Sequence, residues 1–316
     1  MQSAEELLAM MSQVRIPEDA GSLNGIVTPD GFICARGSAG EFDVLIPEVP
    51  DVEQVTESRV GSVRLTSGGT YRVTVGPNVR IGSFLKLSLA SDRADLLGAF
   101  LFIIAAMLPD EFPVSNASAL LGRLTEVLRL LQNDPQPTPE TIKGLWAELW
   151  LIRASPDRGR LVRGWHGRAT DKIDFDVDSR LLEVKCHEGR QRLHSLRLDQ
   201  LLLRPDETFV VSVCIASSPG GESIADFVRE ILPDLAPAES QRLASQVLNT
   251  VGPEVELLSD YRFSIWPDVP PTAVPSTFVP RPLVDSPSVS MVSFRVDLSD
   301  VAKHHGRPID TLLGAL

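Results

Sequence analysis

The sequence predicts a mixed α/β (α+β) protein with an αβββαβ core, a β-rich N-terminal lobe and a proline-rich C-terminal extension. Three observations lead to this class. Gly, Pro and Asp first divide the chain into short strand-like stretches, and helix-like and strand-like stretches then alternate. Seven prolines lie between Pro267 and Pro287. With 316 residues, 43% of them hydrophobic, the chain can bury a core in two or three packed segments.

The N-terminal lobe is predicted to be antiparallel β-structure. A short helix at residues 4–14 comes first, and turn residues then separate five stretches at hairpin-like intervals. The predicted strands are 31–36, 42–46, 62–66, 71–75 and 83–89. Two helices, at residues 95–108 and 116–132, are expected to connect this lobe to the rest of the chain.

The central core is predicted to begin after a stiff, proline-rich connection at residues 134–140. Thr138 followed by Pro139 is a good N-cap and first-turn pair for a helix. A helix, a strand, a hairpin, a second helix and a final strand then follow in the pattern. Their predicted ranges are 139–154, 161–166, 172–186, 195–204 and 208–216. Because the hairpin contributes two strands, the order is αβββαβ.

The C-terminal part is predicted to contain two helices, at residues 223–232 and 238–251, before the proline-rich segment. Strand-like residues 261–266 and 290–298 flank that segment, which favours an extended strap packed on the surface, although a flexible linker is equally allowed. The predicted domains are a β-rich lobe with two helices (1–134), a core (135–220) and a C-terminal extension packed on the core (221–316).

Charge and cysteine content exclude several classes of protein. A net charge of −12 counts against a protein that holds nucleic acid through a broad basic surface. Residues 153–204 nevertheless contain twelve Lys or Arg and eight Asp or Glu, a net charge of +4, whereas the rest of the chain carries −16. Three scattered cysteines argue against a zinc site and a disulfide framework. The sequence has no phosphate-binding P-loop, so any use of ATP must come from a partner.

The longest apolar run, at residues 96–108, is shorter than the roughly 20 residues that a bilayer-spanning helix needs. We therefore expect a buried core helix there and no association with a membrane. The N-terminus is acidic and lacks the pattern of a secretory signal. A cytoplasmic location is the resulting expectation.

The predicted hairpin at residues 172–186 concentrates chemistry on one face. A tight turn at Asp178-Ser179 places Asp174 opposite Glu183. Side chains alternate along a strand, so one face of the hairpin is apolar and the other is charged. The charged face contains Asp174, Asp176, Glu183 and Lys185, with Leu181 as its apolar member. Neighbouring carboxylates repel, and a divalent metal bound by carboxylates and a backbone carbonyl removes that repulsion.

Lys185 lies one side-chain repeat beyond Glu183 on this face. There it can orient or help deprotonate an attacking water while a bound metal polarises a phosphate and stabilises the leaving oxygen. This set of residues fits phosphodiester hydrolysis. A solvated face whose charges pair with one another is the alternative interpretation of the hairpin alone.

Asp174 followed by Glu183-Val-Lys185 resembles the signature of the PD-(D/E)XK nucleases, with Ile173 in place of the proline that often precedes the aspartate. The match covers about residues 139–216. An E-x-K triplet is common by itself, and its place in the αβββαβ order gives it weight. The resemblance implies a restriction-endonuclease-like core.

Three flanking segments bring the resemblance closer to one branch of that superfamily. They are Gly-Leu-Trp-Ala-Glu148-Leu in the first core helix, Gly164-Trp165, and Asp-Gln200-Leu in the second core helix. In such proteins the first core helix commonly supplies a glutamate to the metal site, which here corresponds to Glu148. Gln200 corresponds to a polar residue near the active lysine. The alternatives are a boundary glutamate paired with Arg153 or solvent, and an exposed helical glutamine.

The resemblance therefore implies a Mg²⁺-dependent deoxyribonuclease in which Mn²⁺ is a possible substitute. The implied catalytic residues are Asp174, Glu183, Lys185, Glu148 and Gln200. The implied metal ligands are Asp174, Glu183, the backbone carbonyl of Val184, and Glu148.

Members of that branch are similar to restriction and anti-phage defence components encoded beside helicase-like and methyltransferase proteins. This implies a DNA endonuclease subunit of a restriction-modification or phage-defence system. The expected partners are DNA and helicase/ATPase-like and methyltransferase-like proteins, and a homo-oligomer is compatible with this expectation. The alternative is a catalytically weak or inactive nuclease fold that binds nucleic acid or serves as a scaffold, which the acidic net charge favours.

Basic residues around the hairpin are expected where a nucleic-acid backbone would pass, because arginine forks suit phosphate oxygens. The candidates are Arg163, Arg168, Arg190, Arg192 and His194. Ordinary solvated surface is the alternative for part of this set. Ser195 is expected to cap the helix at 195–204. Trp146, Trp150 and Trp165 are expected in the core rather than stacked on bases.

Overall fold

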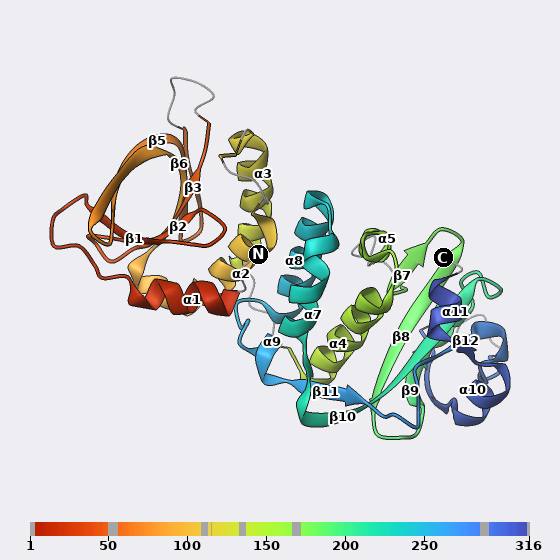
Figure 1. Cartoon of the computed structure of the whole chain (residues 1–316). Helices are drawn as coiled ribbons and strands as arrows, with labels where there is room; N and C mark the ends of the chain where they lie inside the picture. The colour runs from red at the N-terminus through yellow and green to blue at the C-terminus, as the bar shows by residue number, and fades with distance from the viewer. Residues whose placement is uncertain are drawn as a thin grey trace. The chain divides into compact units, whose positions relative to one another are not determined.

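The structure is a computed structural model. It describes residues 4–49, 56–108, 113–114, 116–132, 137–165, 172–284 and 291–314. The chain divides into two compact units (Figure 1). Unit 1 comprises Met1–Gln136 and Ser240–Glu256, and unit 2 comprises Pro137–Glu239 and Leu257–Leu316. The predicted domain limits stay a prediction.

Unit 1 contains a six-stranded sheet that closes on itself. Its strands are β1 (Leu23–Val27), β2 (Ile33–Gly37), β3 (Phe42–Pro47), β4 (Thr56–Val60), β5 (Val63–Val75) and β6 (Asn78–Leu89). The order is β1-β2-β3-β6-β5-β4, and β1 also pairs with β5 in parallel, so that five of the strands form a ring (Figure 1). Buried Ile33, Leu45 and Val73 belong to one cluster packed in this sheet.

The strands predicted at 31–36, 42–46 and 83–89 are confirmed as β2, β3 and β6. The stretches at 62–66 and 71–75 form a single strand, β5, whose register shifts between Thr66 and Gly69. The prediction omits β1 and β4. In β4 only Val60 is buried, so this strand has no apolar alternation to reveal it.

The helices of unit 1 include the apolar run of the sequence. They are α1 (Ala4–Gln13), η1 (Ser91–Leu96), α2 (Leu97–Met107), α3 (Ala117–Leu128), η2 (Arg129–Gln132) and most of α8 (Pro237–Val251). Every residue of α2 except Gly98 is buried, which confirms the expected core helix. Within the described ranges, no helix combines the length and the apolar character that crossing a bilayer requires.

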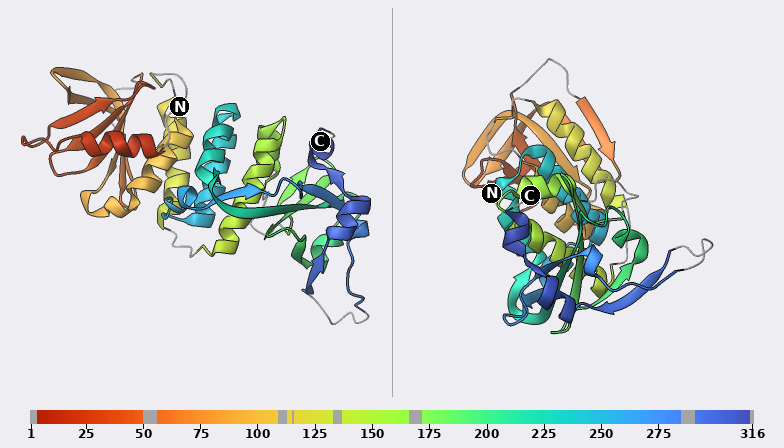
Figure 2. Two further views of the ribbon diagram at one scale, coloured as in Figure 1. Left: turned by 60° about the horizontal axis from the view of Figure 1, so that its bottom comes forward. Right: turned by 90° about the vertical axis from the view of Figure 1, so that its right-hand side faces the viewer.

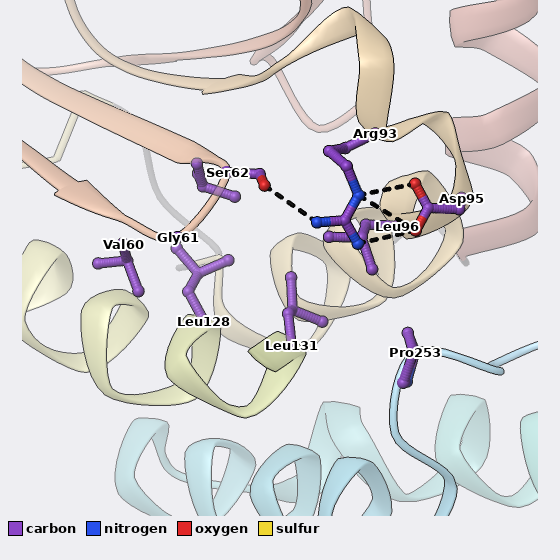
Figure 3. A pocket seen from close by; sticks show the side chains of 10 residues that line it. Val60, Gly61, Ser62, Arg93, Asp95, Leu96, Leu128, Leu131 and Pro253 are labelled. Carbon is purple, nitrogen blue, oxygen red and sulfur yellow. Dashed lines mark hydrogen bonds and ion pairs between the residues drawn. The ribbon is translucent and has the colours of Figure 1, made fainter. Parts of the chain in front are cut away.

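A cavity of about 470 Å³ lies in unit 1, between the turn joining β4 to β5 and the end of α3. Its lining includes Val60, Gly61, Ser62, Leu128 and Leu131 (Figure 3). Arg93 forms a two-pronged ion pair with Asp95 and donates a third hydrogen bond to Ser62 Oγ. The residues with predicted chemistry all belong to unit 2, so this cavity is not their site.

Unit 2 is built on a mixed sheet with a second small sheet beside it (Figures 1 and 2). The large sheet contains β7 (Phe175–Val177), β8 (Arg180–Glu188), β10 (Thr208–Ser223), β11 (Arg262–Ile265), β12 (Thr272–Pro275) and β14 (Arg307–Pro308). Its order is β14-β12-β10-β8-β7, and β11 also pairs with β10. The long strands β8 and β10 are parallel, whereas β7 is antiparallel to β8. The small sheet pairs β9 (Leu193–Arg197) with β13 (Ser293–Asp297).

The helices of unit 2 are mostly short. They are α4 (Pro139–Ala154), α5 (Arg158–Gly164), α6 (Leu198–Leu201), α7 (Ile224–Ile231), η3 (Leu232–Asp234), α9 (Leu257–Asp260), η4 (Ser276–Phe278), α10 (Ser299–His305) and α11 (Ile309–Leu313). The longest, α4, packs against β8 and α7. It begins as predicted, because Thr138 Oγ1 accepts a hydrogen bond from Thr141 N at 3.2 Å and Pro139 occupies the first turn.

Buried aromatic rings fix α4 on the core of unit 2. Trp146 is fully buried, its ring lies 5.0 Å from that of Phe227 between centroids, and its Nε1 donates to Glu222 O at 2.8 Å. Trp165 is also buried and stacks on Phe175. The expectation of a core position is confirmed for Trp146 and Trp165, whereas Trp150 is only half-buried.

The predicted strand at 161–166 is wrong, because residues 158–164 form the helix α5. Asp157 Oδ1 accepts a hydrogen bond from Arg160 N at 2.9 Å and caps this helix. The cap outweighs the strand-like character of Leu161 and Val162. Within the described part of that stretch, Trp165 alone makes a β-bridge, to Phe175.

The predicted helix at 195–204 is wrong in its first part. Ser195 to Arg197 belong to β9, so Ser195 is a strand residue and not an N-cap. The helix there is the single turn α6. The backbone of β9 pairs with β13, which lies far along the chain, and this tertiary pairing overrides the local helical spacing.

The chain order of the core is nevertheless αβββαβ, formed by α4, β7, β8, β9, α6 and β10 with α5 inserted. This mixed α and β architecture is that of a nuclease-like fold. The C-terminal extension contributes to the large sheet, because β12 pairs with β10 in the proline-rich segment. That part of the segment is therefore a strand of the sheet and not a strap on its surface. Residues 285–290 of the segment lie outside the described residues.

Candidate active site

The hairpin of β7 and β8 has the predicted register. Phe175 pairs with Leu182 and Val177 pairs with Arg180, which leaves Asp174, just before β7, facing Glu183. The chain turns at Asp178, whose φ of 53° lies in the left-handed region that aspartate tolerates better than most residues. The local sequence thus brings the two carboxylates together without help from the rest of the fold.

Asp174 is held against β8 by a backbone contact. The amide of Val184 donates to Asp174 Oδ2 at 2.7 Å. Burial raises the pKa of Asp174 well above its ordinary value, and the neighbouring charges of Glu148 and Glu183 raise it further. Three carboxylates therefore act on one another in a small volume. The carbonyl of Val184 stays a predicted ligand.

Glu183 is the most deeply buried member of this group, with 1% of its surface exposed. Its Oε1 accepts from Gln200 Nε2 at 2.7 Å and lies 2.6 Å from Lys185 Nζ. Its Oε2 is buried and has no hydrogen-bond partner among the described residues. Burial raises the pKa of Glu183, and the charge of Lys185 opposes this rise. A buried carboxylate oxygen without a donor is costly unless a cation or water binds it.

Lys185 lies on the same face of β8 as Glu183. Burial by itself lowers the pKa of Lys185, but the charges of Glu183 and Asp174 outweigh it, so the pKa is raised above its ordinary value. The side chain is therefore an ammonium at neutral pH. In this state it neutralises part of the carboxylate charge and can donate hydrogen bonds.

Glu148 reaches the group from α4. Trp165 Nε1 donates to its Oε2 at 2.7 Å. The charge of Glu148 acts on Asp174, Glu183 and Lys185, which places the three close to it. The alternative partner, Arg153, pairs with Glu222 instead.

Gln200 is buried and connects three segments through its side-chain amide. Its Nε2 donates to Glu183 Oε1 and to Lys172 O, both at 2.7 Å. Its Oε1 accepts from Arg197 N at 3.2 Å. The alternative of an exposed helical glutamine is excluded, because only 8% of Gln200 is exposed.

Two of the basic candidates, Arg192 and His194, are buried. The Arg192 guanidinium is buried and donates to Ser212 O and to Pro270 O, at 3.0 and 2.6 Å. His194 is also buried, its Nε2 lies 2.7 Å from Ser212 Oγ, and burial lowers its pKa to about 3. The structure therefore gives both residues a structural role in joining β9, β10 and the segment before β12, because the β9–β13 pairing encloses them.

The other basic candidates differ in position. Arg163 is exposed and pairs with Glu239. Arg190 is exposed, pairs with Asp268 at 2.9 Å and lies over the Trp266 ring. Arg168 lies outside the described residues. A contact of Arg163 and Arg190 with nucleic acid stays a prediction.

Sequence reasoning missed two features near the carboxylates. Trp165 was expected only in the core, yet its indole nitrogen binds Glu148. Lys172 and Arg197 share the carboxylate of Asp199. Arg197 and Asp199 lie just before Gln200 in the chain, and Lys172 contacts Gln200 through its main-chain oxygen. No periodicity marks these residues. The signal that sequence does offer is position, because Lys172 begins the predicted hairpin and Trp165 lies shortly before it.

The donor set is suited to a small, hard cation. The described residues include no group of three or more His, Cys, Asp or Glu arranged to enclose a metal ion. Mg²⁺ does not need such a cage, since it usually binds one or two carboxylates and completes its shell with water and substrate phosphates. Asp174 and the unpartnered Oε2 of Glu183 meet that smaller requirement. The residues present therefore fit the divalent metals that PD-(D/E)XK nucleases typically use.

Comparison with known protein families identifies the central part of the chain. The model of the DUF4420 family, described as a putative PD-(D/E)XK family member, matches residues 102–264. No curated protein and no solved structure matches the chain. The matched range covers just over half of the chain and contains Glu148, Asp174, Glu183, Lys185 and Gln200. The chain therefore belongs to the DUF4420 family of PD-(D/E)XK proteins.

Proposed function

We propose that this protein is a metal-dependent DNA endonuclease that hydrolyses phosphodiester bonds. The observation that carries the proposal is a group of acids, Glu148, Asp174 and Glu183, whose charges act on one another and on Lys185. In this group Glu183 Oε2 is buried and lacks a hydrogen-bond donor among the described residues. Three carboxyl groups meet one ammonium there, and burial raises the pKa of Asp174 and of Glu183. A divalent cation bound by these groups would offset the effect of burial by stabilising their ionised forms.

Asp174 and Glu183 are the proposed ligands of Mg²⁺, with Glu148 and the carbonyl of Val184 as further oxygen donors and Mn²⁺ as a substitute ion. The chemistry supplied by such an ion is polarisation of the scissile phosphate and stabilisation of charge on the leaving oxygen. Lys185, held by Glu183 as an ammonium, donates to a phosphate oxygen or orients the attacking water.

Gln200 and Trp165 support this group from outside. Gln200 fixes the orientation of Glu183, and Trp165 fixes that of Glu148, each through one hydrogen bond at 2.7 Å. Partners of this kind set the direction of a ligand's lone pairs and limit the number of orientations it samples. The proposed roles are therefore metal binding for the carboxylates, catalysis for Lys185 and positioning for Gln200.

We further propose that the protein acts as a subunit of a restriction-modification or phage-defence system in the cytoplasm. The excess of positive charge in residues 153–204 supports a nucleic-acid substrate, and DNA is the polymer that the resemblance favours. The charge of −16 on the rest of the chain supports helicase/ATPase-like or methyltransferase-like partners, or further copies of the chain, that help to hold the DNA.

The decisive experiment is cleavage of plasmid and phage DNA with Mg²⁺ or Mn²⁺, by the protein alone and together with the products of its neighbouring genes. The wild type is expected to nick or cut DNA, and Asp174→Ala and Lys185→Ala are expected to be inactive. Cleavage by both variants at the rate of the wild type would contradict the assignment. Retained folding of each variant, measured by circular dichroism, completes the comparison.

One observation favours a second candidate, a nucleic-acid-binding scaffold without catalytic activity. Glu183 Oε1 is already engaged by Lys185 and by Gln200, and these contacts compete with a metal ion for that oxygen. Titration calorimetry with Mn²⁺ separates the two candidates. An active site gives heat that Glu183→Gln abolishes, whereas a scaffold gives no heat that depends on Glu183.

A further inference from the structure

A small cluster of surface charges lies beside the carboxylate group of unit 2. Lys172 Nζ is 3.0 Å from Asp199 Oδ2, and the Arg197 guanidinium contacts both oxygens of Asp199, at 3.1 and 2.8 Å. The lysine side chain is 52% exposed and the arginine side chain 40% exposed. Two cations thus share one carboxylate, which leaves a net charge of +1 open to solvent.

Gln200 joins this cluster to the carboxylate group. Its Nε2 donates to the main-chain oxygen of Lys172 and also to Glu183 Oε1, both at 2.7 Å. Its Oε1 accepts from the main-chain nitrogen of Arg197 at 3.2 Å. The buried side-chain amide of Gln200 therefore binds the backbone of Lys172, the backbone of Arg197 and the carboxylate of Glu183 at the same time. The cations flank the proposed site of hydrolysis as a consequence of the fold.

A second cluster, in which one aspartate is again shared by two cations, helps to judge this one. Asp226 is shared by Arg229 and Arg262, each at 3.1 Å, with exposures close to those around Asp199. Asp226 also accepts hydrogen bonds from Ser223 N and Oγ and caps α7. The carboxylate of Asp226 therefore stabilises the first turn of α7. The bonds that the structure gives the Asp199 side chain are to Lys172 and Arg197 alone among the described residues.

A polyanion that approaches Glu148, Asp174 and Glu183 meets their negative charge. Cations fixed at the edge of the group offset this repulsion for the phosphates on either side of the reacting one. An arginine fork suits a phosphate's two oxygens, and a lysine adds a point charge. Because Asp199 already holds both side chains, less conformational entropy is lost when a phosphate replaces or joins it.

We propose that Lys172 and Arg197 together bind a backbone phosphate of the nucleic-acid strand next to the one that is hydrolysed, and that Asp199 keeps the two side chains in place when no substrate is bound. The inference rests on the proposed function and names the residues that hold its substrate. It assigns them to binding and not to catalysis.

The test uses the full-length chain and a fluorescent DNA duplex, with binding measured by anisotropy at several salt concentrations in the presence of Ca²⁺. The variants are Lys172→Gln and Arg197→Gln. Both substitutions leave the main-chain atoms that Gln200 contacts, so the carboxylate group keeps its geometry. Each is expected to weaken binding about fivefold and to reduce the slope of log K against log salt by about 0.9. An RNA duplex of the same sequence in a parallel arm identifies the preferred polymer.

The matched control is Arg229→Gln, which removes a cation of similar exposure from the Asp226 cluster. It is expected to leave the affinity and the salt slope unchanged. Equal weakening by Arg229→Gln and Arg197→Gln would overturn the proposal, because general electrostatics would then explain both. Wild-type affinity and slope in both Lys172→Gln and Arg197→Gln would also overturn it.

Cleavage and metal binding distinguish failure of this inference from failure of the proposed function. If the chain is a nuclease, both variants are expected to raise KM with kcat unchanged, and calorimetry is expected to give the wild-type affinity for Mn²⁺. Weaker DNA binding by the variants of a chain that never cleaves supports the phosphate site and overturns the nuclease. If the chain cleaves DNA and both variants bind DNA normally, the nuclease function is supported and the phosphate site is overturned.

Discussion

Each unit of the protein buries acidic groups beside a lysine, and the two sets differ in their balance of charge. In unit 1, Asp43 on β3 is fully buried, and its Oδ2 lies 3.5 Å from Lys86 Nζ. Burial raises the pKa of Asp43, and Lys86 opposes this rise. Glu41 and Arg36 are the other charges that act in this cluster. Two acids and two bases therefore meet there, with no net charge.

The group in unit 2 contains three acids, Glu148, Asp174 and Glu183, and one base, Lys185. Burial of a carboxylate next to a lysine is common to both units, so this feature alone does not identify a site of chemistry. The formal excess of two acids over bases sets the unit 2 group apart, because protons or a bound cation have to offset it. The comparison teaches that the balance of charge, rather than burial or a raised pKa, separates a binding site from a structural ion pair.

The largest expected effect is on cleavage. Asp174→Asn is expected to lower the rate of plasmid nicking on the order of 10³-fold, because an amide is a poor ligand for Mg²⁺. Asp43→Asn is the matched substitution in unit 1 and is expected to leave the rate unchanged. Initial rates at saturating Mg²⁺ test this pair. A comparable loss in both variants would break the distinction between the two clusters.

The next effect is on stability in the presence of metal. Mg²⁺ or Mn²⁺ at about 100 times its Kd is expected to add about 2.7 kcal/mol to the free energy of unfolding of unit 2. Glu183→Gln is expected to abolish this gain, and Asp43→Asn is expected to retain it. Urea unfolding with and without EDTA measures the difference. A metal-dependent gain that survives in Glu183→Gln would place the ion elsewhere.

A smaller effect is expected on stability without metal. Asp174→Asn removes one of three repelling carboxylates and is expected to raise the free energy of unfolding in EDTA by about 2 kcal/mol. Asp43→Asn is expected to lower it instead, because Lys86 loses its counterion. Urea unfolding of the two variants side by side checks the order. If Asp43→Asn proves the more stabilising substitution, the charge-balance argument is wrong.

The smallest effect concerns Trp165, which binds Glu148 from outside the group. Trp165→Phe keeps an aromatic ring against Phe175 but removes the indole donor. We expect Mn²⁺ affinity to fall about tenfold, as is usual when a partner of a metal ligand is lost. Calorimetry measures this change. The control is Trp146→Phe, which removes a hydrogen bond to the main-chain oxygen of Glu222 and none to Glu148. Equal effects of the two substitutions would point to general loosening of the core.

The geometry of the hairpin was predictable from sequence, because the two-residue period of a strand and the short turn at Asp178-Ser179 are local properties. The apposition of Asp174 and Glu183 follows from them. Glu148 and Gln200 come from distant segments, and the resemblance to a known signature is what connected them with the hairpin. Their contacts with the hairpin depend on how α4 and α6 pack, which no local pattern encodes.

The predictions that proved wrong concern segments whose structure is not set by the local sequence. Residues 195–197 have helical spacing, yet they form a strand because β13 supplies hydrogen-bond partners from the C-terminal part of the chain. The same pairing buries His194 and Arg192, which sequence alone places on the surface near a substrate. The helix at 158–164 depends on a cap at Asp157 that competes closely with the apolar pattern of a strand. Long-range pairing and marginal local preference thus account for what sequence did not reveal.

The position of each carboxylate in the large sheet determines how far it can move. Glu183 and Lys185 lie on β8, which has β7 on one side and β10 on the other, so their backbone amides should be among the slowest of unit 2 to exchange hydrogen with solvent. Asp174 lies just outside β7, at the edge of the sheet, where opening costs less. The backbone of Glu183 is therefore expected to be rigid, and that of Asp174 to be more mobile. An ion of different radius would be accommodated by a shift of Asp174 while Glu183 and Lys185 stay in register.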